Sequence, residues 1–169
     1  MNAIFKRKSI MKFKNQLVED EKIINLLKAG MQAPSAHNSQ PWEFIVVSNP
    51  LAIEEVSKMS PYAAPAKGAN KLIITLTNMN RIYDKKTDDW FVQDMSACCE
   101  NILLQAVDEG LGAVWLGFYP SLERVYRLKE YFKVPENIMP FSVIAIGYYD
   151  NKTPVKKRFD KSKIHIEKY

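Results

Sequence analysis

The segment 19–31 predicts a helix because its apolar residues recur at helical spacing. These apolar residues are Ile23, Ile24, Leu27 and Met31. The acidic residues at positions 19–21 fit the first turn, where the helix dipole favours anions. Pro34 and a polar run over 35–40 then end the helical pattern.

The segment 90–109 carries the strongest helical pattern of the chain. Its apolar stripe consists of Val92, Met95, Cys99, Ile102 and Ala106. Gly110 supplies a stop signal at the end of this stripe. Because Cys99 falls on the stripe, we interpret it as a small buried residue and not as a reactive thiol.

Strands are expected where aromatic and β-branched residues cluster. The segments of this kind are 42–47, 71–77, 113–118 and 141–148. Shorter helices are expected over 51–59 and from a Ser121 cap to Phe132, with Val125 and Leu128 on the apolar face. The charged stretch 81–89 predicts a surface loop or lid. Strands and helices interleave irregularly, which favours an α+β sandwich over a regular βαβ repeat.

Length and composition indicate one globular domain over residues 1–169. The chain is 47% hydrophobic and 25% charged, and no apolar run approaches the roughly 18–20 residues that span a bilayer. Residues 1–9 are basic and lead into no apolar stretch, so no secretory signal is expected. Cys98 and Cys99 are adjacent and cannot form a disulfide framework, which favours a reducing cytoplasm. His37 and His165 are far apart, so no metal site is expected.

The chain carries a net charge of +5, from 24 Lys and Arg against 19 Asp and Glu. Basic residues concentrate near both ends of the sequence. Such a patch can bind nucleic acid, hold one phosphorylated cofactor, or be an ordinary solvated surface. No regular basic–aromatic pattern supports a nucleic-acid partner.

Common catalytic motifs are absent from the sequence. The glycines Gly110 and Gly112 suggest a dinucleotide-binding turn, but the third glycine is missing and the pair follows a helix instead of a strand. No phosphate-binding P-loop, zinc-protease, serine-hydrolase or CxxC motif is present. We therefore expect no catalytic side chain and a cofactor that supplies the chemistry.

Three short segments together carry a resemblance. They are Arg-Lys-Ser-Ile-Met-Lys-Phe at 7–13, Pro-Ser-Ala-His-Asn-Ser-Gln-Pro-Trp at 34–42, and Ala-Val-Trp-Leu-Gly-Phe at 113–118. In this order and at these distances, the chain resembles the FMN-dependent nitroreductase family over its whole length. The run 34–42 is the most specific part of the resemblance.

The resemblance implies a nitroreductase-like α/β/α sandwich with a central mixed, mainly antiparallel sheet. It also implies an intertwined homodimer with FMN at the subunit interface. Residues 7–9 would then come from one subunit and residues 35–40 from the other. The tail, from about 150 to 169, is extended and has few apolar residues, so we expect it to wrap the partner subunit.

Each segment has a physical reason to bind FMN. Cations and fixed donors suit the phosphate dianion, whereas small polar side chains and backbone donors suit the ribityl hydroxyls and the pyrimidine edge. A residue without Cβ, such as Gly117, lets the backbone approach a flat ring. The expected cofactor-binding residues are Arg7, Lys8, Ser9, Pro34, Ser35, Ala36, Asn38, Gln40, Leu116, Gly117, Lys157 and Arg158.

One position departs from the family pattern. Family members usually carry Arg or Lys four residues after the arginine that aligns with Arg7, and this chain has Met11. Lys12, Lys67 or Lys71 are alternative sources of a cation for the reduced flavin, or the flavin edge is left uncompensated.

The resemblance implies an FMN-dependent oxidoreductase with a ping-pong mechanism. Such an enzyme takes hydride from NAD(P)H and reduces a small planar acceptor, either a nitroaromatic, a quinone or an activated alkene. The alternative is a flavin-binding storage or sensor protein with little turnover. Rapid bleaching of bound flavin by NADH or NADPH distinguishes the two.

Overall fold

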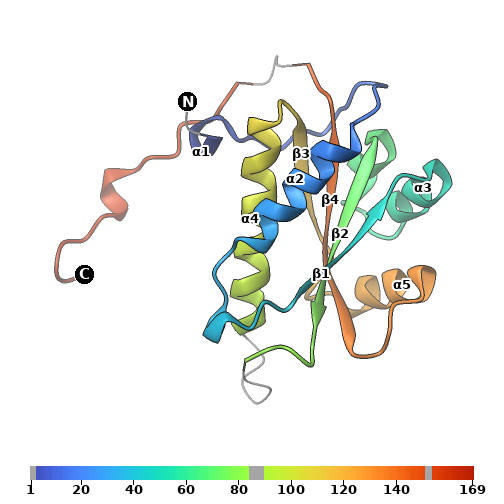
Figure 1. Ribbon diagram of the computed structural model, residues 1–169. Coiled ribbons are helices and arrows are strands. Elements are labelled where there is room, and N and C mark those ends of the chain that lie inside the picture. Colours follow the sequence, from blue (N-terminus) through green and yellow to red (C-terminus); the bar gives the residue numbers. More distant parts are fainter. Residues whose placement is uncertain (1–2, 84–89, 151–153) are drawn as a thin grey trace.

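A four-stranded antiparallel sheet divides the core of the molecule in two (Figure 1). Its strands are β1 (Trp42–Val47), β2 (Lys71–Asn78), β3 (Gly112–Gly117) and β4 (Ile138–Gly147), in the order β1-β2-β4-β3. Each neighbouring pair is antiparallel, whereas Ser9 forms an isolated parallel bridge with Ala113 at the β3 edge. The structure is a computed structural model that describes residues 3–83, 90–150 and 154–169.

Helices cover both faces of the sheet and make an α/β/α sandwich, as expected (Figure 1). On one face lie α2 (Asp20–Met31) and α4 (Trp90–Asp108). On the other lie α3 (Pro50–Lys58) and α5 (Leu122–Phe132). The short helix α1 (Ala3–Lys6) contacts α4, and 3₁₀ turns occupy Ala36–Asn38 (η1), Ala64–Gly68 (η2) and Lys161–Lys163 (η3).

Successive side chains of a strand point to opposite faces of the sheet, so each strand contributes to both halves of the core. On β4, Ile144 and Ile146 pack under α2 and α4, whereas Val143 and Ala145 pack under α3 and α5. Because both sheet faces are covered, β4 is apolar at nearly every position and does not alternate with polar residues.

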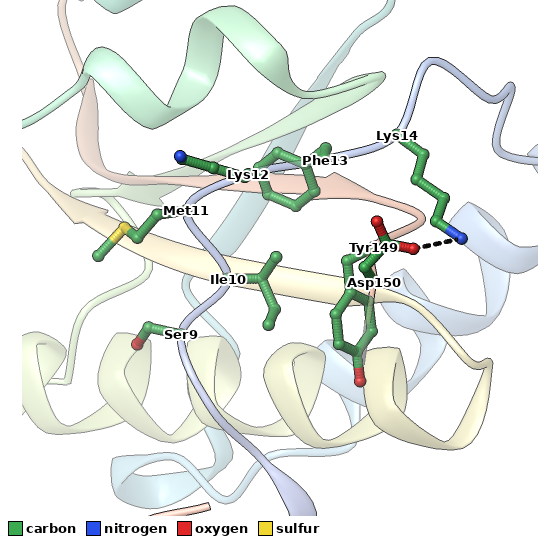
Figure 2. Close-up of a pocket in the computed structure, with 8 residues that line it drawn as sticks. All are labelled: Ser9, Ile10, Met11, Lys12, Phe13, Lys14, Tyr149 and Asp150. Carbon is green, nitrogen blue, oxygen red and sulfur yellow. Dashed lines mark ion pairs between the residues drawn. The ribbon is translucent and has the colours of Figure 1, made fainter. Parts of the chain in front are cut away.

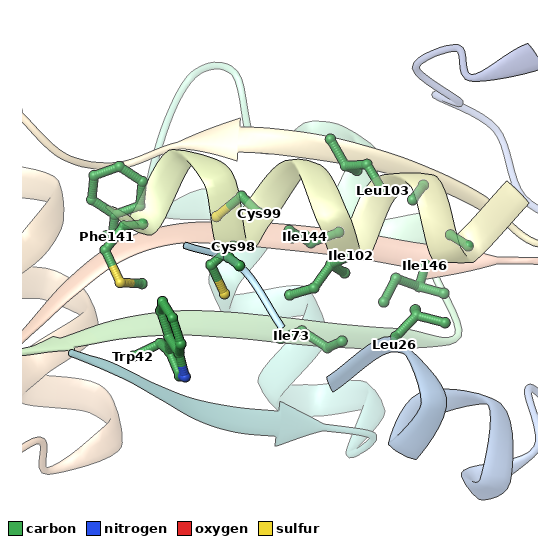
Figure 3. Packing of buried hydrophobic residues seen from close by; sticks show 14 of the residues in the cluster. Leu26, Trp42, Ile73, Cys98, Cys99, Ile102, Leu103, Phe141, Ile144 and Ile146 are labelled. Atoms are coloured by element: carbon green, nitrogen blue, oxygen red, sulfur yellow. The ribbon is translucent and has the colours of Figure 1, made fainter. Parts of the chain in front are cut away.

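The contact between α2 and α4 is close because it passes through a glycine. A Cβ on Gly30 would lie 2.9 Å from Cγ1 of Ile102, a fully buried residue of α4. This contact selects Ile23, Leu26 and Gly30 as the buried stripe of α2, and Figure 3 shows Leu26 and Ile102 within the same packed cluster. The predicted helix is confirmed, although two of the apolar residues that predicted it, Ile24 and Met31, flank this contact and are 49% and 52% exposed.

The C-terminal end of α4 and the N-terminal end of α5 test the start and stop signals of the sequence. The N–H groups of Gly110 and Leu111 donate to the carbonyls of Val107 and Ala106 at 3.1 and 2.7 Å, which is a Schellman motif with Gly110 at φ 72°. The expected stop is thereby confirmed. Ser121 is the N-cap of α5 but its hydroxyl makes no cap hydrogen bond, so the side-chain cap expected there was wrong; its carbonyl accepts from Val125 N–H instead.

The C-terminal tail leaves the body of the molecule (Figure 1). Residues 154–169 are exposed throughout and include only the turn η3. The expected loop at 81–89 lies outside the described residues from position 84 onward. No helix in the described ranges is long and apolar enough to cross a membrane.

A pair of glycines lets the N-terminal segment cross the sheet. Gly112 on β3 and Gly147 on β4 are direct neighbours in register. Ile10 lies over Gly112 and Phe13 over Gly147, with ideal Cβ positions only 2.8 Å and 2.9 Å from their side chains. Figure 2 shows residues 9–14 running across the two strands. The absence of side chains at these two adjacent positions therefore allows the segment that begins with Arg7 to pass over β3 and β4.

Replacing Gly112 with alanine tests this crossing. The new Cβ would meet Cβ and Cγ1 of Ile10 and Cδ1 of Tyr149 at 3.0 Å or less. We expect Gly112→Ala to lower the free energy of unfolding by about 1–3 kcal/mol, the usual cost of overpacking a core. Urea unfolding measures the change. Gly68→Ala is the matched control, because nothing lies within 4 Å of a Cβ at that position; equal losses in both variants would contradict the close crossing.

The two cysteines give a pH-dependent prediction. Both are fully buried, which confirms the interpretation of Cys99, and burial raises the pKa of both thiols, that of Cys99 to about 11 (Figure 3). An unfolded thiol ionises near pH 9.0. Between these values the unfolded chain releases protons that the folded chain keeps, so stability falls as pH rises above about 9.

Urea midpoints at pH 8 and pH 10.5 test this dependence. The wild-type protein should lose more stability over that interval than the variant Cys98→Ala/Cys99→Ala, in which neither thiol can ionise. Identical losses would contradict the raised thiol pKa values.

Candidate functional site

Arg7 and the basic tail line one cavity. Its volume is about 670 Å³, and its basic walls are Arg7, Lys156, Lys157 and Arg158. Arg7 is half-buried, and its Nε lies 3.3 Å from Oε1 of Glu100 on α4. Arg7 and three cations of the tail therefore form one local group, the cation cluster, although they come from opposite ends of the sequence.

Lys8 and Ser9 do not join Arg7 in this cavity. The Nζ of Lys8 lies 5.6 Å from the centre of the Tyr149 ring. Ser9 lines a different pocket of about 400 Å³, together with Met11 and Lys12 (Figure 2). The three side chains have different surroundings, so the expected triad does not converge in one chain.

The turn at residues 35–40 has an unusual backbone. His37, Asn38 and Gln40 have φ values of 49°, 56° and 48°, in the left-handed region that non-glycine residues rarely adopt. The Ser35 hydroxyl accepts from Gln40 N–H at 3.0 Å, and Gln40 Nε2 donates to Asn38 Oδ1 at 2.7 Å. This geometry leaves the side chains of Asn38 and Gln40 exposed, and His37 stacks on Tyr83 with a ring separation of 3.7 Å.

A residue that the sequence analysis missed holds this turn. Asp94 on α4 is buried, and its Oδ1 accepts from Ala36 N–H at 2.9 Å. Its Oδ2 accepts from the Ser39 hydroxyl at 3.4 Å. The sequence does contain a signal, because Asp94 is a charged residue on the same helix face as the apolar residues Phe91, Met95 and Cys98. Charged residues are rarely buried without a partner.

The end of β3 is open at Gly117. A Cβ at this position would meet no heavy atom within 4 Å, and the Gly117 carbonyl accepts from Arg124 Nη1 at 3.5 Å. The Leu116 side chain is buried on the α3 and α5 side of the sheet. Only the backbone of Leu116 can therefore contact a ligand at this edge.

The expected segments lie apart within one chain. Residues 7–9 and 35–40 are both attached to α4, through Glu100 and Asp94, which are roughly 9 Å apart along the helix axis. Gly117 lies roughly 13 Å along β3 from Ala113, the bridge partner of Ser9. Trp42, which follows the turn, is on the opposite sheet edge from Gly117, roughly 14 Å away across the strands.

The three lysines that could supply a cation near Met11 have different surroundings in the structure. Lys67 pairs with Glu54 at 3.7 Å, and Lys71 pairs with Asp20 at 2.9 Å. Lys12 is exposed and lines the same pocket as Met11 (Figure 2). Of the three lysines, Lys12 is the one placed beside the position that departs from the pattern.

Neither metal ligands nor a reactive thiol occur at these segments. Among the described residues, no group of three or more His, Cys, Asp or Glu side chains could hold a metal ion. The Cys99 thiol instead lies in a buried polar cluster, 3.3 Å from the Ser142 hydroxyl and 3.6 Å from the Thr75 hydroxyl.

Comparison with known proteins finds relatives that cover the whole chain or nearly all of it. A protein from Methanothermobacter thermautotrophicus, provisionally named NADH dehydrogenase/NAD(P)H nitroreductase, is 40% identical over 169 residues, covering 100% of this chain and 87% of its own. A crystal structure from Clostridium acetobutylicum, provisionally named NADH oxidase, has a TM-score of 0.93 at 48% identity, over 99% of this chain and 100% of its own. An FMN-dependent nitroreductase from Clostridium difficile has a TM-score of 0.89 at 28% identity, over 99% of both chains.

The profile of the nitroreductase family matches residues 4–66 and 54–148. These ranges include all three segments of the expected site and nearly the whole sandwich. The chain belongs to the nitroreductase family.

Proposed function

We propose that this protein is an FMN-dependent NAD(P)H oxidoreductase that folds as a single domain over residues 1–169 and acts in the cytoplasm. One observation carries the proposal: Arg7 and the tail cations surround a cavity of about 670 Å³ in a chain of the nitroreductase family. The Clostridium difficile relative is FMN-dependent, and the Methanothermobacter relative is named for NAD(P)H.

The basic cavity fits the phosphate of FMN. A phosphate dianion needs several cations, and here Arg7 contributes a planar fork whereas Lys156 and Lys157 contribute point charges. Glu100 already pairs with Arg7 and holds its guanidinium in place. Phosphate binding would therefore add to an arginine that is already oriented.

The other segments suit the remaining parts of the cofactor. The half-buried side chain of Ser35 and the exposed side chains of Asn38 and Gln40 offer donors and acceptors for ribityl hydroxyls and the pyrimidine edge. The open space at Gly117 allows a flat ring to approach the backbone. The polar groups of the turn thus match the polar parts of FMN, and the open position at Gly117 matches its flat ring.

A second copy of the chain would complete the site. The cation cluster and the turn at 35–40 are separate in one chain, and the tail carries exposed apolar side chains such as Phe159, which is 83% exposed. Phe5, beside the cation cluster, is 75% exposed. We infer a homodimer in which the tail covers apolar surface of the partner and the two halves of the cofactor site meet.

FMN, when bound, supplies two-electron chemistry between NAD(P)H and a planar acceptor such as a nitroaromatic, a quinone or an activated alkene. The protein's own residues bind and orient. Arg7 and the tail lysines neutralise the phosphate, the turn fixes the polar edge, and Gly117 leaves room for the ring. With solvent as the proton source, no side chain has to act as a general acid or base.

Replacing Arg7 tests the phosphate assignment. Loss of charge-assisted hydrogen bonds predicts that Arg7→Ala raises the Kd for FMN by about tenfold to a hundredfold. Quenching of flavin fluorescence on binding measures the Kd. Arg127→Ala is the control, because Arg127 is an exposed cation that pairs with Glu123 on α5. An unchanged Kd in Arg7→Ala would refute the assignment.

Reduction of the bound flavin separates an enzyme from a storage or sensor protein. Anaerobic addition of NADH or NADPH should bleach the visible absorption of the loaded wild-type protein within seconds, and a nitroaromatic or a quinone should restore it. Flavin that co-elutes with a dimer but resists bleaching by both nucleotides would favour the storage or sensor function.

A further inference from the structure

Asp94 connects the turn at residues 35–40 to the core. The residue is 5% exposed and 58 positions away in sequence from Ala36, to which it is hydrogen-bonded. In the described part of the chain, both hydrogen bonds between this turn and α4 end on Asp94, one from Ala36 N–H and one from the Ser39 hydroxyl. Burying a carboxyl group is costly unless it is hydrogen-bonded, and these two donors compensate the cost.

The turn needs support from outside itself. His37, Asn38 and Gln40 are left-handed, and each such non-glycine residue persists only where its surroundings fix it. The bonds from Gln40 N–H to Ser35 and from Gln40 Nε2 to Asn38 are internal to the turn, so they shape it without placing it. Asp94 accepts hydrogen bonds from Ala36 and Ser39, the residues on either side of the left-handed pair His37 and Asn38.

The core around Asp94 does not need the carboxyl group. Its neighbours on the same helix face, Phe91, Met95 and Cys98, are buried in an apolar cluster that continues through Ile102. This cluster fixes α4 by packing, whereas the Asp94 carboxyl group faces the turn. Its removal should release the turn and leave the sandwich intact.

We propose that Asp94 is a positioning residue for the cofactor, an inference that rests on the proposed FMN function. It acts through Ala36 and Ser39 and does not touch the ligand. By fixing these two residues it sets where the polar groups of Ser35, Asn38 and Gln40 stand, so that the turn is formed before FMN arrives. Without it, part of the binding free energy is spent on ordering the turn.

FMN titrations of the full-length protein test the proposal. We expect Asp94→Ala to raise the Kd for FMN by about tenfold or more. Asp94→Asn should stay within about threefold of wild type, because the asparagine carbonyl can accept from Ala36 N–H and its amide can donate to the Ser39 hydroxyl. Asp108→Ala, a change of an exposed aspartate on the same helix, is the matched control and should leave the Kd unchanged.

Two readouts separate positioning from a general loss of stability. The thermal midpoint of the FMN-free protein should change little in Asp94→Ala, and amide hydrogen exchange should speed up at residues 36–40 and not along β4. Comparable weakening in Asp94→Ala and Asp94→Asn, or exchange that rises across the whole sheet, would overturn the positioning role.

The remaining outcomes are also decisive. If Asp94→Ala does not fold, Ser39→Ala removes one of the two bonds and should raise the Kd severalfold; an unchanged Kd then overturns the inference. Normal FMN binding by Asp94→Ala overturns this inference alone. A wild-type protein that binds no FMN overturns the proposed function and this inference with it.

Discussion

The packing of α4 against the sheet positions three segments of the candidate site, namely Arg7, the turn at 35–40 and the end of β3. Its buried stripe, from Phe91 to Ala106, covers the face formed by β2, β3 and β4. The same helix then offers polar groups at its margins, Asp94 to the turn at 35–40 and Glu100 to Arg7. Its C-terminal Schellman motif turns the chain directly into β3, which ends at Gly117. One rigid element therefore fixes the relative places of segments that are far apart in sequence.

The sequence predicted the sandwich well because local patterns determine it. The strand at 42–47 was predicted with its observed bounds, and β4 begins three residues earlier than expected, at Ile138. Contacts between distant residues explain the errors. The buried face of α2 depends on Gly30 meeting Ile102, which no pattern within α2 records. The left-handed turn likewise depends on Asp94, 58 residues away from Ala36.

The sequence proposes the residues of the candidate site but not how they are arranged in space. Arg7, Lys157 and Arg158 share a cavity although opposite ends of the chain supply them, which charge counting alone suggests only weakly. Leu116 and Gly117 are adjacent, yet one side chain is buried and the other position is open to solvent. The direction in which a strand residue points, and not its residue type, decides whether it can contact a ligand. That direction is known only once the strand has been placed in the sheet.

The two facing glycines also constrain the order in which the molecule folds. The surface under Ile10 and Phe13 exists only after β3 and β4 have paired, because Gly112 and Gly147 belong to different strands. Docking there closes a loop of about a hundred residues, a costly step in chain entropy that local helices do not face. The segment that carries Arg7 should therefore dock late in folding. The part of the site at Arg7 would then form after the sandwich that supports it.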